Sequence, residues 1–149
     1  QRVNKSRKLL GGKASFFLAS AGALMSYKRQ PVTLTLGGEA HELDELTVAA
    51  CCVGRYFGGG MMIGPEADPS DGLLDVVALD RVGRWDMMRM TSIYTGEHLS
   101  NPKVSLWRGA EVQAVANGDH ECLIEADGEV IGMLPATFES LPKAFRIKV

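Results

Sequence analysis

The stretch "YFGGGMMIGPEADPSDGLLDVV", residues 56–77, decides how the chain around it folds. Three consecutive glycines at 58–60 give the backbone access to conformations that other residues avoid. They match neither a Walker loop nor a dinucleotide fingerprint. The glycines therefore predict either a bulge that redirects a strand or a backbone surface that a ligand or another domain approaches closely. An acidic, proline-rich turn follows at 65–71, and the apolar run at 72–80 predicts a strand.

The rest of the chain also consists mainly of predicted strands. Residues 45–53 are mostly apolar and are predicted to form a strand buried on both faces. Further strands are predicted at 32–36, 110–116, 121–126, 129–134, 137–141 and 145–149. Residues 13–28 have apolar residues at helical spacing, and 83–99 have the composition of a second helix. We therefore predict one mainly β domain with two helices (α+β) over residues 1–149, most simply a two-layer β-sandwich.

Composition narrows the possible partners. The chain has 149 residues, a formal net charge of −2 and a pI near 5.9, which argues against a general nucleic-acid binder. Basic residues crowd positions 2–13, where they predict either a solvated face or a patch that contacts anionic phospholipids. The most apolar stretch, 16–25, is well short of the roughly 20 residues needed to span a bilayer.

The cysteines and histidines form no recognisable site. Cys51 and Cys52 are neighbours in a predicted strand, so their side chains should point to opposite faces, and Cys122 is isolated. The chain has no CxxC pair, and its three histidines lack the spacing of zinc ligands. Reduced cysteines in a cytoplasmic protein are the expected state.

Two acidic turns carry the candidate chemistry. Asp68 and Asp71, with the carbonyl of Leu73, could present oxygen ligands to Mg²⁺, or the two aspartates could bond only to their own backbone. Asp127, followed by Gly128, lies between alternating apolar residues and predicts a type I′ hairpin turn. Asp127 could also accept the proton of a hydroxyl nucleophile if a phosphate donor lay opposite.

Together these stretches resemble one family. Residues 54–77, 124–149 and 7–39 resemble the C-terminal domain of diacylglycerol kinase-like lipid kinases, a group that includes bacterial soluble diacylglycerol kinases and sphingosine-kinase relatives. The resemblance implies two domains with the active site in the cleft between them. An N-terminal α/β domain with a Gly-Gly-Asp-Gly type motif would bind ATP, and the C-terminal domain would be a β-sandwich. This chain resembles only the second, so we expect the ATP-binding domain to be absent from it and the isolated chain to be inactive.

The resemblance also implies roles for individual residues. Asp68, Asp71 and the carbonyl of Leu73 match the positions that hold a structural Mg²⁺ in related enzymes. Asp127 matches the acid proposed as general base for the lipid hydroxyl, and Glu129 matches the adjacent acid of that site.

The sequence departs from the family pattern at one place. Family members often have Ala-Asn-Gly before the Tyr-Phe-Gly-Gly-Gly run, whereas this chain has Cys52, Val53 and Gly54 there. The amide missing at Val53 calls into question a hydrogen bond near the cleft, and with it the usual substrate or full activity.

The function implied by the resemblance is an ATP-dependent lipid kinase that transfers the γ-phosphate of ATP to a hydroxyl of diacylglycerol, a sphingoid base or phosphatidylglycerol. Mg²⁺ and the co-substrate ATP are expected, with a cytoplasmic location that includes peripheral contact with the inner face of the membrane. A non-catalytic, metal-stabilised module that binds lipid or protein is the alternative, as is a kinase of the related NAD kinase architecture with a non-lipid acceptor. Whether the protein forms a homodimer stays open.

Overall fold

The computed structural model describes residues 28–83, 85–86 and 91–144. Within these ranges the chain forms eight strands and two short 3-10 turns. In chain order they are β1 (Gln30–Leu36), β2 (Glu39–Cys52), β3 (Leu74–Asp80), η2 (Thr91–Tyr94), η3 (Glu97–Ser100), β4 (Val104–Gly109), β5 (Glu111–Ala116), β6 (Leu123–Ala126), β7 (Glu129–Met133) and β8 (Ala136–Glu139).

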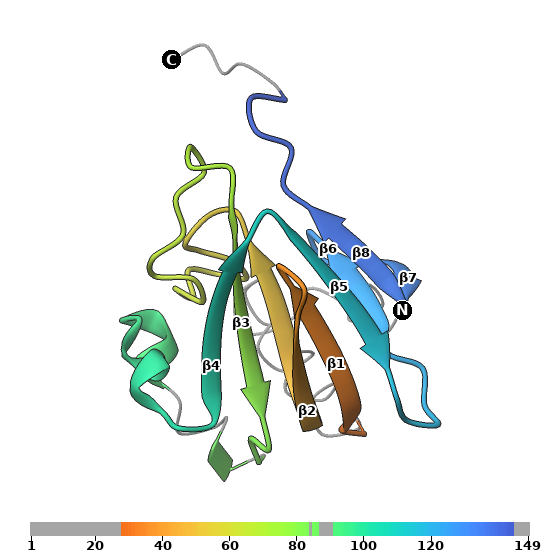
Figure 1. The fold of residues 1–149 in the computed structure, drawn as a ribbon. Helices are drawn as coiled ribbons and strands as arrows, with labels where there is room; N and C mark the ends of the chain where they lie inside the picture. The colour runs from red at the N-terminus through yellow and green to blue at the C-terminus, as the bar shows by residue number, and fades with distance from the viewer. Residues whose placement is uncertain (1–27, 84, 87–90, 145–149) are drawn as a thin grey trace, which may run out of the picture.

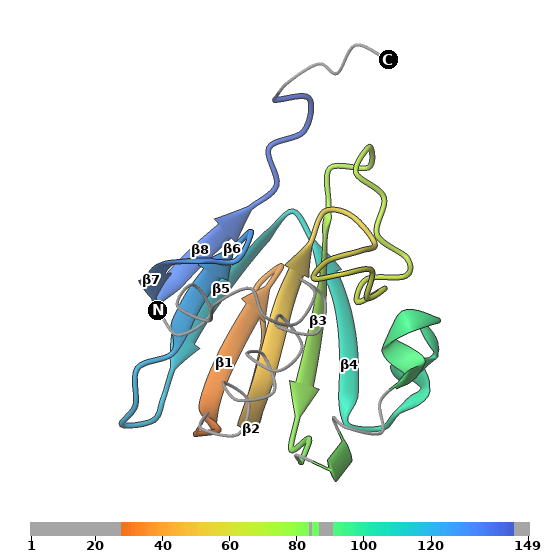
Figure 2. The ribbon, with the colours of Figure 1, turned by 180° about the vertical axis from the view of Figure 1, so that it is seen from behind.

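Six of these strands form one antiparallel sheet in the order β4-β3-β2-β1-β5-β8 (Figure 1). The other two, β6 and β7, form a separate antiparallel hairpin at the end of the molecule where β5 and β8 lie (Figures 1 and 2). The amide of Leu134 donates to the carbonyl of Cys122 at 2.9 Å and closes the base of this hairpin. The prediction of a mainly β domain is confirmed.

The best-packed strand is β3, in which every residue but the last is buried. Side chains of a strand alternate between its two faces. Leu74, Val76 and Ala78 join an apolar cluster with residues of β1, β2 and β5, whereas Val77 and Leu79 join a second cluster on the other face. The second cluster includes side chains of the β2–β3 loop and of η2. This strand therefore anchors both the sheet and the loop that enters it.

The predicted strand 45–53 packs against apolar clusters on both faces, as expected, but it is less deeply buried than β3. Most of the predicted strand 45–53 is only partly buried, and β2 itself is 14 residues long, whereas its neighbours β1 and β3 have seven each. The strand at β3, by contrast, was predicted with nearly its observed bounds.

The two predicted helices fare differently. The segment 13–28 lies, except for its last residue, outside the described residues, as does the predicted strand 145–149. A single helix over 83–99 is wrong, because η2 and η3 are separate 3-10 turns. Between them Gly96 has a φ of 79°, which no continuous helix accommodates. A Cβ at this glycine would lie 2.9 Å from the Cβ of Pro65, so the close approach of the two segments also requires glycine.

Two hairpin turns have the same backbone geometry, and the sequence predicted the one at Asp127 and Gly128. The central residues of the β1–β2 turn, Gly37 and Gly38, have φ values of 55° and 86°. The β6–β7 turn has 50° at Asp127 and 86° at Gly128. Positive φ at both central positions is the mark of a type I′ turn, which matches the twist of the strands it joins.

Candidate functional site

The loop 53–73 connects β2 to β3 and begins with a tight glycine turn. Phe57 and Met61 each donate their amide to the other's carbonyl, both at 3.0 Å. The three glycines between them have φ values of 43°, 79° and 98°. A Cβ at either of the last two would meet no atom within 4 Å, so the turn is open rather than crowded. The geometry supports the bend interpretation of the glycines.

Both predicted metal-ligand aspartates lie in the second half of this loop and bond locally. Asp68 Oδ1 accepts the amide of Ser70 at 2.8 Å and its hydroxyl at 2.6 Å. Asp71 Oδ1 accepts the amide of Leu73 at 2.8 Å. The Ser70 hydroxyl, followed by the Ser70 amide, lowers the pKa of Asp68 from its ordinary value. Both side chains are therefore held in Asx-type turns, the local interpretation that the sequence left open.

Arg108, on β4, ties this loop to the core. Its Nε donates to Asp75 Oδ1 at 2.7 Å, and its Nη2 donates to Asp71 Oδ2 at 2.9 Å. Asp75 lies directly opposite Arg108 in the β3–β4 register, and its side chain is only 2% exposed. The hydrogen bond and charge of Asp75 raise the pKa of the arginine. A buried carboxylate thus holds the inner end of Arg108, and a loop carboxylate meets its outer end.

The 3-10 turns hold the first half of the loop. The amide of Met62 donates to the carbonyl of Ile93 in η2 at 2.8 Å. In η3, His98 is 1% exposed, and its Nε2 lies 3.0 Å from the carbonyl oxygen of Ile63. A carbonyl only accepts hydrogen bonds, so this contact assigns the proton to Nε2. His98 is therefore a structural residue that fastens η3 to the loop.

The other predicted acids lie on the β6–β7 hairpin. Asp127 occupies the turn, Glu129 begins β7, and both are exposed. Within residues 28–83, 85–86 and 91–144, neither carboxylate has a hydrogen-bond or ion-pair partner. Four large apolar side chains of the hairpin are also exposed, between 52% and 65%. They are Leu123, Val130, Ile131 and Met133.

The two acidic sets lie on separate elements. Asp68, Asp71 and Leu73 share one loop, whereas Asp127 and Glu129 share one hairpin, and no hydrogen bond or ion pair recorded in the described part of the chain joins the two. The structure therefore brings together the members of each predicted set but does not bring the two sets into contact.

The donor chemistry of the loop fits a hard cation. Two carboxylates and one carbonyl from a short turn are oxygen ligands of the kind that Mg²⁺ accepts, with waters to complete the shell. Asp75 Oδ2 is also buried and has no hydrogen-bond partner among the described residues. No three His, Cys, Asp or Glu side chains cluster as metal ligands over the described ranges. A cation here would therefore depend on Asp68, Asp71, the carbonyl of Leu73 and water.

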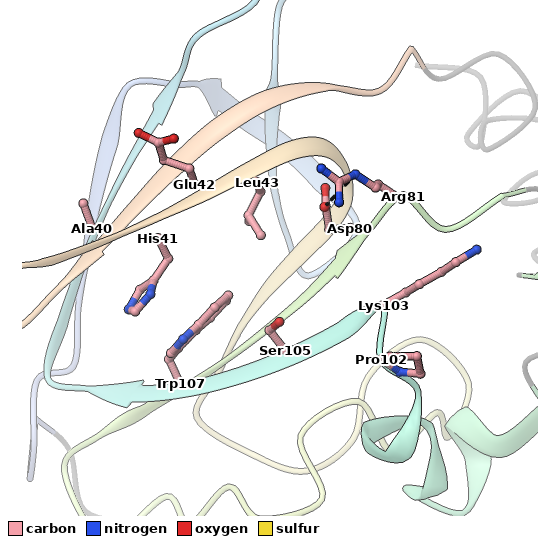
Figure 3. A pocket seen from close by; sticks show the side chains of 10 residues that line it. All are labelled: Ala40, His41, Glu42, Leu43, Asp80, Arg81, Pro102, Lys103, Ser105 and Trp107. Atoms are coloured by element: carbon pink, nitrogen blue, oxygen red, sulfur yellow. Dashed lines mark ion pairs between the residues drawn. The ribbon is translucent and has the colours of Figure 1, made fainter.

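An open pocket of about 490 Å³ lies elsewhere, over β2, β3 and β4 (Figure 3). His41 and Trp107 stack in it with ring centroids 4.5 Å apart. None of the predicted site residues lines it. Its two cationic side chains are already engaged, Arg81 with Asp44 and Asp80 and Lys103 with Asp86.

The cysteines are not candidate nucleophiles. Cys51 packs against one apolar cluster and Cys52 belongs to the other, so they point to opposite faces as predicted. Burial raises the pKa of each of these thiols to about 11, which leaves almost no thiolate at neutral pH. Cys122 is also buried and forms no disulfide among the described residues.

Sequence reasoning missed Arg108, Asp75 and the strand β4 that carries the arginine. A signal was present, because Asp75 interrupts an otherwise apolar predicted strand. A carboxylate buried in that way requires a charged or hydrogen-bonding partner. The sequence alone did not show which residue that partner is, since the β3–β4 register decides it.

Comparison with known proteins places the chain in a family. Residues 1–149 match the family described as the YegS C-terminal NAD kinase beta sandwich-like domain. The chain belongs to this family. It is also 31% identical over 137 residues to a protein named diacylglycerol kinase in Mycobacterium tuberculosis, in both strain CDC 1551 / Oshkosh and strain ATCC 25618 / H37Rv. That match covers 91% of this chain and 43% of the relative.

A solved structure shares the fold. The crystal structure described as a diacylglycerol kinase from Bacillus anthracis strain Sterne superposes with a TM-score of 0.63 at 23% identity, over 85% of this chain and 42% of that one. The chain thus spans less than half the length of these relatives. No helix in the part of the chain that the structure describes is both long enough and apolar enough to cross a bilayer.

Proposed function

We propose that this domain is the C-terminal part of an ATP-dependent lipid kinase that transfers the γ-phosphate of ATP to a lipid hydroxyl. The main support is the match of the whole chain to the YegS C-terminal family, together with 31% identity to a protein named diacylglycerol kinase. The acceptor is diacylglycerol or another lipid with a free hydroxyl, such as a sphingoid base. ATP is the co-substrate, and it binds mainly to an N-terminal α/β domain outside this chain.

The hairpin acids supply the base in this proposal. Phosphoryl transfer needs a positioned hydroxyl and a group that accepts its proton, with little covalent work by the protein. Asp127 is exposed at a turn whose backbone is set by its type I′ geometry, and its carboxylate has no partner among the described residues. Both features suit a group that receives a proton from a molecule outside the domain. Glu129, two residues further on, adds a second negative charge to this site.

The loop acids hold a structural Mg²⁺ in this proposal. Asp68, Asp71 and the carbonyl of Leu73 would be its protein ligands, and the ion would supply charge neutralisation that fixes the loop entering β3. No step of the transfer involves these residues directly. The domain's own contribution to the reaction is the base on the hairpin and the fixed position of the loop.

Two other functions compete with this one. A non-catalytic module would keep the metal loop and use the exposed apolar side chains of the hairpin to bind lipid or protein. A kinase with a non-lipid acceptor is the second alternative, because the matched family is described as an NAD kinase beta sandwich-like domain. Such a kinase would keep both acidic sets.

We further propose a cytoplasmic protein that works at the inner face of the membrane. The basic segment proposed to contact lipid, residues 2–13, lies outside the described residues.

The test uses the full-length protein. Wild type, Asp127→Asn and the control Glu125→Gln are each incubated with Mg²⁺, γ-labelled ATP and a membrane lipid extract, and the labelled lipids are separated. We expect one labelled lipid with wild type and with the control, and a loss of about 10²–10⁴-fold with Asp127→Asn, the usual contribution of a general base. Absence of labelled lipid with folded, ATP-binding wild type would contradict the lipid kinase and favour one of the two alternatives.

A further inference from the structure

Arg108 links the proposed cation loop to the most deeply buried strand. Its Nε is fixed by Asp75, which is 1% exposed, and its Nη2 reaches Asp71 at the surface. A third, longer contact of 3.5 Å runs from Nη2 to the carbonyl of Glu66 in the same loop. The guanidinium is therefore shared between the core and two points of the loop.

We infer that Arg108 is a positioning residue for the cation of this loop, because it holds the Asp71 carboxylate in its ligating place before the ion arrives. This inference rests on the proposed Mg²⁺ site. It goes beyond that site because it assigns part of the loop's affinity for the cation to Arg108. This residue lies on another strand and touches neither the ion nor any substrate.

The hydrogen bonds of Asp71 leave room for an ion. A carboxylate has about four lone-pair sites. Asp71 uses one on Oδ1 for the amide of Leu73 and one on Oδ2 for Arg108, so each oxygen can still accept a further partner. Asp68 uses only Oδ1 among the recorded bonds. Arg108 therefore orients Asp71 without displacing a cation, in the way that outer partners orient metal ligands in other proteins.

Lysine should not replace this arginine. The guanidinium presents two separate N–H groups, one for Asp75 and one for Asp71, in a rigid planar arrangement. A lysine ammonium keeps the charge but is a single point on a flexible chain, and it cannot hold both carboxylates in the same positions. Arg108→Lys therefore separates the positioning role from the charge.

The experiment measures Mn²⁺ binding to nucleotide-free full-length protein by electron paramagnetic resonance, which reports free Mn²⁺. Binding that disappears in Asp68→Asn is assigned to the loop. We expect Arg108→Lys to weaken this loop-dependent binding about 10-fold, the lower end of what loss of an outer partner does to metal affinity. The matched control is Arg29→Lys, because Arg29 is equally exposed (40% against 41%) and pairs with Glu45 outside the loop. We expect this control to bind Mn²⁺ as wild type does.

The outcomes separate this inference from the proposed function. Equal affinity of Arg108→Lys and Arg29→Lys, or tighter binding by Arg108→Lys, would overturn the positioning role while leaving the loop site intact. If wild type shows no loop-dependent Mn²⁺ binding, both the proposed metal site and the positioning role of Arg108 are wrong. The lipid-labelling assay would still test the proposed kinase activity. If Arg108→Lys does not fold, Asp75→Asn weakens the inner anchor without altering any group that touches Asp71, and it should raise the Mn²⁺ dissociation constant several-fold. Unchanged affinity in that variant would also refute the inference.

Discussion

The two acidic turns of this domain are built in opposite ways. In the loop before β3, Asp68 and Asp71 accept hydrogen bonds from the loop itself, and Arg108 ties Asp71 to the buried Asp75. On the β6–β7 hairpin, Asp127 is exposed and has no partner within the described ranges. The loop enters a strand that is buried on both faces, whereas the hairpin carries exposed apolar side chains.

This difference separates two chemical roles. A carboxylate that is already oriented by its own protein is suited to be a fixed ligand, because little order has to be gained when an ion binds. A carboxylate without internal partners keeps its capacity to accept a proton from an incoming hydroxyl. The same residue type therefore serves structure in the loop and, in the proposed function, chemistry on the hairpin.

The largest expected effect is on the free energy of unfolding, and it separates substitutions in β3, the strand that the loop enters, from substitutions in the β6–β7 hairpin. Leu79 is fully buried in β3, and Leu79→Ala should lower the free energy of unfolding by about 2–5 kcal/mol. Ile131 in β7 is 65% exposed, and Ile131→Ala should change it by no more than about 0.5 kcal/mol. Urea denaturation of the full-length variants measures both. Equal losses would mean that another part of the protein buries the hairpin as firmly as the sheet buries β3.

The two turns should also differ in their response to a methyl group. Gly72 in the loop and Gly128 in the hairpin both have positive φ, 77° and 86°, so alanine costs about 1–2 kcal/mol at either position. At Gly72 the new Cβ would also lie 3.3 Å from the Cβ of Pro142, whereas at Gly128 it would meet nothing within 4 Å. We expect the larger fall in thermal midpoint for Gly72→Ala, and the reverse order would show that the hairpin turn is the more crowded one.

The smallest expected effect is on the pKa of one carboxyl group, that of Asp68. Because the Ser70 hydroxyl is the main cause of the lowered pKa of Asp68, Ser70→Ala should raise that pKa toward its ordinary value, whereas Ser70→Thr keeps the hydroxyl and the low pKa. A lowered folded-state pKa stabilises the fold above the unfolded-state pKa, and this contribution is lost as the pH falls through the folded-state value. An NMR titration of the Asp68 carboxyl carbon measures the change. No shift in Ser70→Ala would mean that the serine does not hold this carboxylate.

Local signals in the sequence were enough for much of the fold. The Asp127-Gly128 pair predicted a hairpin turn, and the apolar run at 72–80 predicted β3, because turn chemistry and apolar runs are properties of neighbouring residues. Non-local packing explains the failures. The predicted helix breaks at Gly96, where an added Cβ would lie 2.9 Å from the Cβ of Pro65, a residue far away in the chain. The Arg108–Asp75 pair follows from the register between β3 and β4, which brings together two residues 33 positions apart in the chain.

The candidate residues were predictable only in part. Spacing alone allowed either a metal site or a local turn at Asp68 and Asp71, and family resemblance was needed to favour the metal. The structure adds the tether through Arg108, which no local pattern contains. In the proposed function, the lipid acceptor would be selected by the shape of a site that also includes residues outside this domain, and no pattern within these 149 residues identifies that lipid.

The most direct test of the two roles is a Mg²⁺ titration of lipid kinase activity in full-length Asp68→Asn and Asp127→Asn at saturating ATP. If Asp68 is a ligand and Asp127 the base, Asp68→Asn should shift the Mg²⁺ requirement to higher concentration and recover most of its turnover there. Asp127→Asn should stay inactive at every Mg²⁺ concentration, because added cation cannot replace a proton acceptor. Recovery of Asp127→Asn by Mg²⁺, or the same Mg²⁺ dependence in both variants, would contradict the division of labour between the loop and the hairpin.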